Sequence, residues 1–132
     1  MGVRYLLDTH VLLWLLVSPQ RVAAQARAAL ADKQNVLLVS AASAMEVATK
    51  TRLGRLDAGH GLTAAWTART TEIGAEQLPI SADHAVLAGS MAWDHRDPFD
   101  RFLVAQALRE NLILVTVDSK MLTLPGLNTL TW

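Results

Sequence analysis

The sequence predicts an α/β fold, a sandwich built around a central, mainly parallel sheet. Short and nearly continuous apolar runs with β-branched residues occur at Val3–Leu7, Val36–Val39 and Leu112–Val117. Runs of this kind are typical of strands that are covered on both faces in a parallel sheet. Longer helical stretches separate them, and strands that alternate with helices indicate βαβ units with right-handed crossovers.

The first half of the chain follows its opening strand with three expected helices. They are Val11–Val17, Val22–Ala31 and Ala41–Leu53. The third has the clearest boundaries, because Ser40 is placed to cap its first turn and Gly54 to end it. The strand Val36–Val39 precedes this helix.

The second half has the same alternation. Its expected helices are Leu62–Glu72, Ala82–Met91 and Pro98–Glu110. Ser81 marks the start of the second of these, and Asp97 is a good N-cap for the third, where Pro98 suits the first helical position. Gln77–Ile80 and Leu127–Leu130 are weaker strand candidates.

Composition limits the class of protein. The chain has 132 residues, which fits one domain over residues 1–132, and 52% of them are hydrophobic, which excludes disorder over most of its length. Twelve Lys and Arg balance twelve Asp and Glu, so a charged ligand must be held by local groups. The absence of cysteine excludes disulfides, thiolate metal sites and cysteine nucleophiles.

The sequence also bears on localisation. The longest apolar run, Val11–Val17, is far shorter than the roughly 18 residues that a membrane span needs. Asp8 and His10 interrupt the segment where a secretory signal would be most apolar. We therefore expect a cytoplasmic protein with no membrane partner.

Four of the acidic residues stand at positions that suggest chemistry. Asp8 and Asp118 each directly follow an expected strand, so both leave the carboxyl edge of the sheet, where open α/β folds bind ligands. Glu46 lies in a run of small residues that packs closely against the sheet, and Asp100 opens the last helix.

Each acid also has a purely structural interpretation. Asp8 can cap the following helix, and Asp118 can form an Asx turn. Asp100 can be a helix-dipole carboxylate paired with Arg101, and Glu46 can lie on an exposed helix face. These interpretations leave unexplained why two strands end in Asp at one sheet edge.

If the four carboxylates meet, a cation must accompany them. Two carboxylates about 4 Å apart repel by roughly 4 kcal/mol at an effective dielectric constant near 20. Hard oxygen ligands, without Cys or a helical His pair, favour Mg²⁺ or Mn²⁺ over zinc. Such an ion activates water and stabilises charge on a phosphoryl group, which is the chemistry of nucleases and phosphatases.

Four motifs carry a family resemblance. They are Leu6–His10, Ser40–Val47, His95–Ala107 and Leu114–Asp118. In this order they resemble a PIN-domain ribonuclease of the bacterial VapC toxin type, from about Val3 to Trp132. The third motif is highly specific, whereas the first alone is weak.

The resemblance implies a three-layer α/β/α fold, a single PIN-like nuclease domain, and a metal-dependent endoribonuclease that acts as the toxin of a toxin–antitoxin pair. Carried over by motif position, the catalytic and metal-binding residues are Asp8, Glu46, Asp100 and Asp118, with Mg²⁺ or Mn²⁺ as cofactor. Thr9, Asp97 and Thr116 are possible supporting residues. Because Asp97 suits the N-cap so well, we expect its side chain to turn back on its own helix and leave Asp100 facing the metal.

The resemblance also implies partners: an RNA substrate, a cognate antitoxin, a second copy of the chain in a homodimer, and DNA reached indirectly through the antitoxin. The candidate RNA contacts are Lys50, Arg52, Arg55, Arg96 and Arg101. The first three can instead serve helix C-terminal electrostatics. Trp14, Trp66 and Trp93 are interpreted as core or interface anchors rather than base-stacking groups, with Trp14 left open.

Other classes of protein fit less well. A phosphoacceptor receiver domain needs an Asp after a middle strand, where this chain has Ser40, and an aspartyl phosphatase needs a second Asp where it has His10. The stronger alternative is a non-catalytic PIN-like module that binds RNA or protein.

Overall fold

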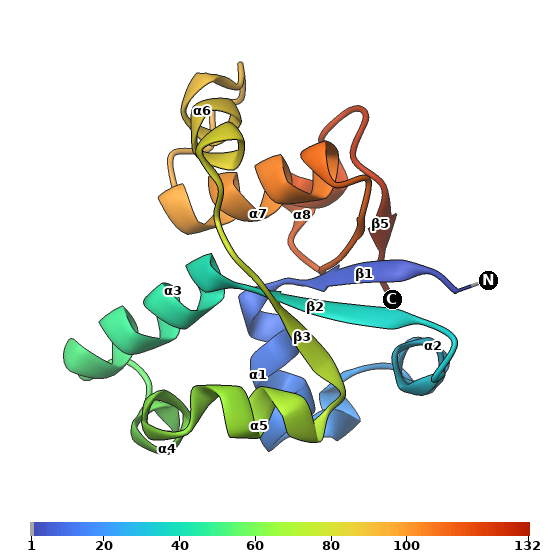
Figure 1. Cartoon of the computed structure of the whole chain (residues 1–132), viewed down its shortest axis with the longest axis vertical. Coiled ribbons are helices and arrows are strands. Elements are labelled where there is room, and N and C mark those ends of the chain that lie inside the picture. The colour runs from blue at the N-terminus through green and yellow to red at the C-terminus, as the bar shows by residue number, and fades with distance from the viewer. Residues whose placement is uncertain (1) are drawn as a thin grey trace.

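The computed structural model describes residues 2–132 and has three layers, with helices on both faces of a sheet (Figure 1). The strands are β1 (Arg4–Leu7), β2 (Val36–Ser40), β3 (Ala75–Leu78), β4 (Ile113–Val115) and β5 (Thr129–Leu130). The helices are α1 (Thr9–Val17), α2 (Ala24–Ala31), α3 (Ala41–Arg52), α4 (Gly59–Ala64), α5 (Trp66–Glu72), α6 (Ala82–Ser90), α7 (Pro98–Arg109) and α8 (Ser119–Leu122), with a short 3₁₀ helix at Pro19–Arg21. The predicted α/β/α architecture is confirmed. In the described part of the chain, no helix has both the length and the apolar character that crossing a bilayer requires.

The topology of the sheet favours ligand binding at the carboxyl ends of its strands. Within residues 2–132, five strands run parallel in the order β3-β2-β1-β4-β5. The strand order therefore reverses between β1 and β4, and ligands of open α/β sheets bind outside the carboxyl ends at such a point. Leu7 of β1 pairs with Val115 of β4, so Asp8 and Thr116 leave the sheet side by side.

Successive strand residues serve opposite faces of the sheet, as the period of two requires. Tyr5 and Leu7 pack with apolar residues of α1 and α2, whereas Leu6 packs with apolar residues of α7 and α8. Figure 1 shows these two groups of helices on opposite sides of the sheet. Because both faces are covered, the side chains of the three central strands β1, β2 and β4 are mostly apolar.

The expected caps form as the sequence indicates. The Ser40 hydroxyl accepts a hydrogen bond from the Ala42 N–H at 2.9 Å and starts α3. The Asp97 carboxylate accepts from the Phe99 N–H at 2.8 Å and starts α7. Asp97 thus turns back on its own helix, as predicted.

The prediction of a single helix at Leu62–Glu72 is wrong. The chain here forms two helices, α4 and α5, which meet at Ala65 with φ −140° and ψ 42°. The two halves have different packing partners. Gly59 of α4 lies against Thr51 of α3, whereas the indole N–H of Trp66 in α5 donates to Gln77 of β3 at 3.0 Å. A straight helix would not follow both neighbours.

All five strands differ from their expected bounds, β1 and β2 by one residue at one end and the other three by two residues at one end or both. The strand expected at Leu112–Val117 is the shorter β4, which ends at Val115, and the Thr116 hydroxyl after it bonds the Asp8 carboxylate and the Asp118 N–H. The candidate at Gln77–Ile80 is β3, which ends before Pro79 because proline has no N–H for the ladder. The candidate at Leu127–Leu130 is the two-residue β5.

The contact between α3 and α4 predicts opposite effects for two glycines of the same helix. An alanine Cβ at Gly59 would lie 1.7 Å from Oγ1 of Thr51, which is itself bonded to the Val47 carbonyl at 2.7 Å. Gly61 has nothing within 4 Å of that position. We expect Gly59→Ala to destabilise the fold by about 1–3 kcal/mol and Gly61→Ala to stabilise it by about 0.5–1 kcal/mol. Urea unfolding measures both, and equal stability of the two variants would contradict the packing described.

Candidate functional site

Asp8 is buried at the carboxyl end of β1 and does not cap the helix that follows it. Its backbone is in the capping conformation, but its side chain makes no capping hydrogen bond with α1. Instead, Oγ1 of Thr116 donates to Oδ2 of Asp8 at 2.7 Å, in a buried environment. The capping interpretation of Asp8 is therefore wrong, and the residue is held across the sheet edge from β4.

Glu46 is buried on α3, so the interpretation as an exposed helix residue is also wrong. The Lys50 ammonium donates to Oε2 of Glu46 at 2.6 Å. Its other oxygen, Oε1, is buried and has no hydrogen-bond partner among the described residues. An unsatisfied carboxylate oxygen in the interior is costly, so it marks a place where a further ligand would be favourable.

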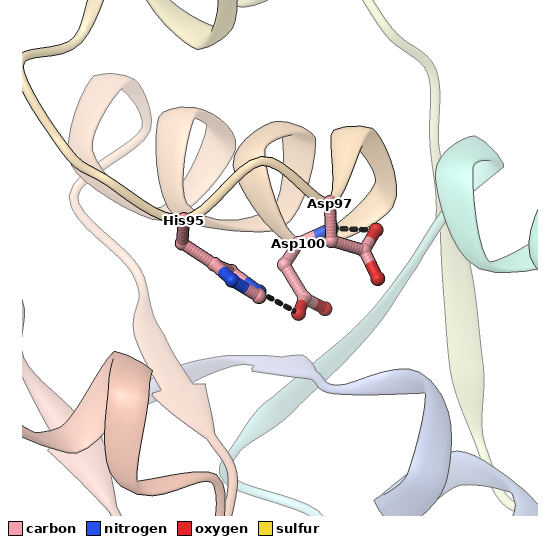
Figure 2. A group of neighbouring side chains, drawn as sticks. All are labelled: His95, Asp97 and Asp100. Atoms are coloured by element: carbon pink, nitrogen blue, oxygen red, sulfur yellow. Dashed lines mark hydrogen bonds and ion pairs between the residues drawn. The ribbon is translucent and has the colours of Figure 1, made fainter.

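Asp100 faces the same region from the first turn of α7. Nε2 of His95 lies 2.6 Å from Oδ2 of Asp100, and both side chains are 13% exposed (Figure 2). The ligand atoms of His95, Asp97 and Asp100 all lie within 4.8 Å of one another. This group includes His95, which the sequence alone does not predict as a site residue.

Asp118 has a local role as well as a link to the site. Its Oδ1 accepts from the Lys120 N–H at 2.9 Å and caps α8, so the turn predicted for it is present. Its N–H donates to Oγ1 of Thr116 at 3.1 Å. Because Thr116 in turn donates to Asp8, the Thr116 hydroxyl connects Asp8 with Asp118.

The four predicted acids share a region but not a single tight cluster. Within residues 2–132, no three of Asp8, Glu46, Asp100 and Asp118 bring ligand atoms within 4.8 Å of one another. Charges on Glu46 and Asp100 nevertheless interact with Asp8. Thr9 adds to the assembly, because its hydroxyl lies 2.8 Å from the Ser43 hydroxyl and joins the start of α1 to α3.

Burial and mutual repulsion raise the pKa values of two of these acids. Burial raises the pKa of Asp8, and the charge of Glu46 adds to this, while the hydrogen bond from Thr116 opposes it. Burial likewise raises the pKa of Asp100 from 3.8 to about 6, with contributions from Asp97 and Asp8, against the hydrogen bond with His95. Ionised carboxylates are therefore held here at a cost.

These observations fit a divalent cation. The donors are hard carboxylate oxygens, which suit Mg²⁺ or Mn²⁺. One of them, Oε1 of Glu46, is buried without a partner, and Asp8 and Asp100 have raised pKa values that a positive charge would lower. A divalent charge would offset the cost of holding Asp8 and Asp100 ionised, and among the described residues the group that brings three ligand atoms within 4.8 Å is His95, Asp97 and Asp100.

The expected RNA contacts have different surroundings. Lys50 is paired with Glu46, whereas Arg52, Arg55 and Arg96 are exposed. Arg101 is bonded to the backbone through its guanidinium, which donates at 2.7–2.9 Å to the carbonyls of Ala88, Met91, Trp93 and His95. The assignment of Arg101 as an RNA contact is therefore corrected: it fixes the loop that carries His95.

Comparison with known proteins finds a matching family and similar solved structures. The sequence model of the PIN domain family matches residues 5–127. The structure is similar to VapBC2 from Rickettsia felis bound to a DNA fragment from its promoter, with a TM-score of 0.74 and 18% identity over 98% of this chain and 99% of that chain. VapBC-1 from nontypeable Haemophilus influenzae has a TM-score of 0.70 and 18% identity, covering 98% of each chain. FitAB bound to an IR36 DNA fragment has a TM-score of 0.61 and 16% identity, covering 96% of this chain and 94% of that chain. No curated protein sequence matches the chain.

The raised pKa of Asp100 predicts a pH-dependent gain from removing its charge. Its pKa is about 6 in the fold against 3.8 ordinarily, so the ionised group weakens the fold above about pH 6, and this cost disappears as the pH falls from 6 to 3.8. Asp100→Asn should therefore raise the free energy of unfolding at pH 7.5 in EDTA by about 1–3 kcal/mol, and by less at pH 5. Urea unfolding at both pH values tests this, with exposed Asp57→Asn as the control. A gain that does not shrink at pH 5 would contradict the argument.

The hydrogen bonds of the Arg101 guanidinium predict that a lysine, which keeps only the positive charge, cannot take its place. Lysine keeps the charge but has no planar fork to reach four carbonyls. We expect Arg101→Lys to lower the free energy of unfolding by about 2 kcal/mol or more, against almost no change for exposed Arg52→Lys. Hydrogen exchange should also speed up at residues 91–96 in the Arg101 variant. Unchanged exchange there would show that the loop does not depend on Arg101.

Proposed function

The chain belongs to the PIN domain family, and from this premise we propose that it is a Mg²⁺- or Mn²⁺-dependent endoribonuclease that acts as the toxin of a toxin–antitoxin pair. We propose further that residues 1–132 act as one nuclease domain. The observation that carries the proposal is the set of acids at the carboxyl edge of the sheet, where Asp8 and Glu46 are buried and Oε1 of Glu46 has no partner among the described residues.

Asp8, Glu46, Asp100 and Asp118 are the residues proposed to bind the metal. When bound, a divalent cation supplies charge that stabilises a phosphoryl group and lowers the pKa of water. The chain contributes orientation: Thr116 fixes Asp8 through Oδ2, and His95 fixes Asp100 through Oδ2. Preorganised carboxylates need little rearrangement during reaction, which is how such sites gain rate.

The proposed substrate is RNA, held by local positive charge because the chain has no net charge. Exposed Arg52 and Arg55 follow the helix of Glu46, and exposed Arg96 lies next to His95. Phosphate contacts by such residues would position the strand without reading its sequence.

The proposed protein partners are a cognate antitoxin and a second copy of the chain. Two of the similar structures, VapBC2 from Rickettsia felis and FitAB, are bound to DNA fragments, which supports the proposal that this chain reaches DNA together with a partner. Val17, Met45 and Leu53 are apolar and half or more exposed, and large exposed apolar residues suit protein interfaces.

Metal-dependent cleavage of RNA tests the proposal. We expect the purified chain to cut total RNA with Mg²⁺ or Mn²⁺ and to lose this activity in EDTA. Asp8→Asn and Glu46→Gln should each lower the rate by about 10²-fold or more, because each removes an anionic ligand. Asp57→Asn removes an exposed carboxylate elsewhere and should cut at the parental rate.

The same assay decides between the two functions. Absence of metal-dependent cleavage by the folded parent chain would overturn the nuclease and favour a non-catalytic module that binds RNA or protein. Cleavage by Asp8→Asn at the parental rate would show that the acids have been assigned wrongly.

A further inference from the structure

A cleft of about 680 Å³ lies between the loop at residues 92–97 and α8. Trp93, His95 and Arg96 line it from the loop, and Lys120 and Thr123 line it from α8 and the residue after that helix. The cleft adjoins the acids on both sides, because His95 binds Asp100 and the Lys120 N–H binds Asp118.

The cleft carries two cations that are not neutralised. Within residues 2–132, the ion pairs of the structure involve neither Arg96 nor Lys120, and both are exposed. In a chain with no net charge, two such cations beside one hollow are a local attraction for phosphate. Asp94 and Asp97 share the lining, so the cleft is not a simple anion site.

The cleft also has a rigid aromatic wall. Trp93 packs against the core cluster that contains Leu6 and Leu103, and its ring lies 4.9 Å from that of His95. Arg101 holds the carbonyls of both residues, so the loop is fixed before any ligand arrives. Trp93 is an anchor, as predicted, because it packs on the core, and it also lines the cleft.

Positive groups beside an aromatic side chain match the chemistry of an unpaired nucleotide. Bases of single strands stack on aromatic rings, and basic side chains follow the backbone. Carboxylates in the same lining can accept hydrogen bonds from base amino groups. A duplex hides those faces and edges, so a paired strand would use the cleft poorly.

We infer that this cleft binds one unpaired nucleotide of the RNA strand, with its phosphate on Arg96 and Lys120 and its base against Trp93. The inference rests on the proposed function, because it takes RNA as the substrate. It adds Trp93 and Lys120 to the residues that contact the RNA.

Binding of a labelled oligonucleotide tests the inference. The probe is a fluorescein-labelled, unstructured RNA of about ten nucleotides, and all variants carry Asp8→Asn so that the probe stays intact in Mg²⁺. Fluorescence anisotropy should show that Lys120→Ala and Arg96→Ala each weaken binding at least about threefold and lower the salt slope by about 0.7. Trp93→Leu should weaken binding at least about fivefold. Lys33→Ala, an exposed lysine outside the cleft lining, is the matched control and should bind as its parent does.

Three results would overturn the inference. They are equal losses in Lys33→Ala and Lys120→Ala, equal affinity for a duplex of the same sequence, and no binding of the probe by the parent. Because Arg96 and Lys120 are exposed, their variants test the cleft even if Trp93→Leu fails to fold. Metal-dependent cleavage that is unaffected in Lys120→Ala and Arg96→Ala would overturn the cleft while leaving the nuclease intact, whereas absent cleavage would remove the proposed function itself.

Discussion

The site depends on the parallel pairing of β1 with β4. This pairing brings together residues that are more than a hundred positions apart: the Asp8 N–H donates to the Val115 carbonyl at 3.0 Å, and Thr116 then bonds the Asp8 carboxylate. Once the ladder forms, Asp8 cannot turn towards the solvent without losing a buried hydrogen bond. The sheet therefore holds a carboxylate in the interior, where its pKa is raised, and α3 and α7 add Glu46 and Asp100 to the same region.

A second constraint comes from one arginine. The loop between α6 and α7 forms no helix or strand, so its partly buried carbonyls need hydrogen-bond donors from elsewhere. The Arg101 guanidinium supplies these donors from the first turns of α7. The same bonds that stabilise the loop also position His95 against Asp100, so the stability of this region and the geometry of the site have a common origin.

The sequence predicts what depends on periodicity and on local hydrogen bonding. Covered strands, the Asp97 cap and the acids that follow β1 and β4 can all be read from neighbouring residues, and the family resemblance adds the order of the motifs. It does not predict interactions set by tertiary packing. His95 has no local signal for its contact with Asp100, and Arg101 next to an acid suggests an ion pair, whereas four distant carbonyls compete successfully for it. The break at Ala65 is similarly invisible, because it arises from two neighbours that lie elsewhere in the chain.

The net charge of the chain is zero, but positive and negative side chains are not evenly distributed around the site. The carboxylates of Asp8 and Glu46 are buried at the sheet edge and that of Asp100 is partly buried, whereas Arg96 and Lys120 are exposed beside them. Solvent screens exposed cations over about 8–10 Å in physiological salt, so they act on a ligand at short range, whereas buried acids are screened far less. A phosphate approaching this edge would meet exposed Arg96 and Lys120, together with exposed Asp94, before it reached the buried acids. On the proposed function, Arg96 and Lys120 would attract the phosphate towards carboxylates that would otherwise repel it, provided that a divalent cation accompanies the acids.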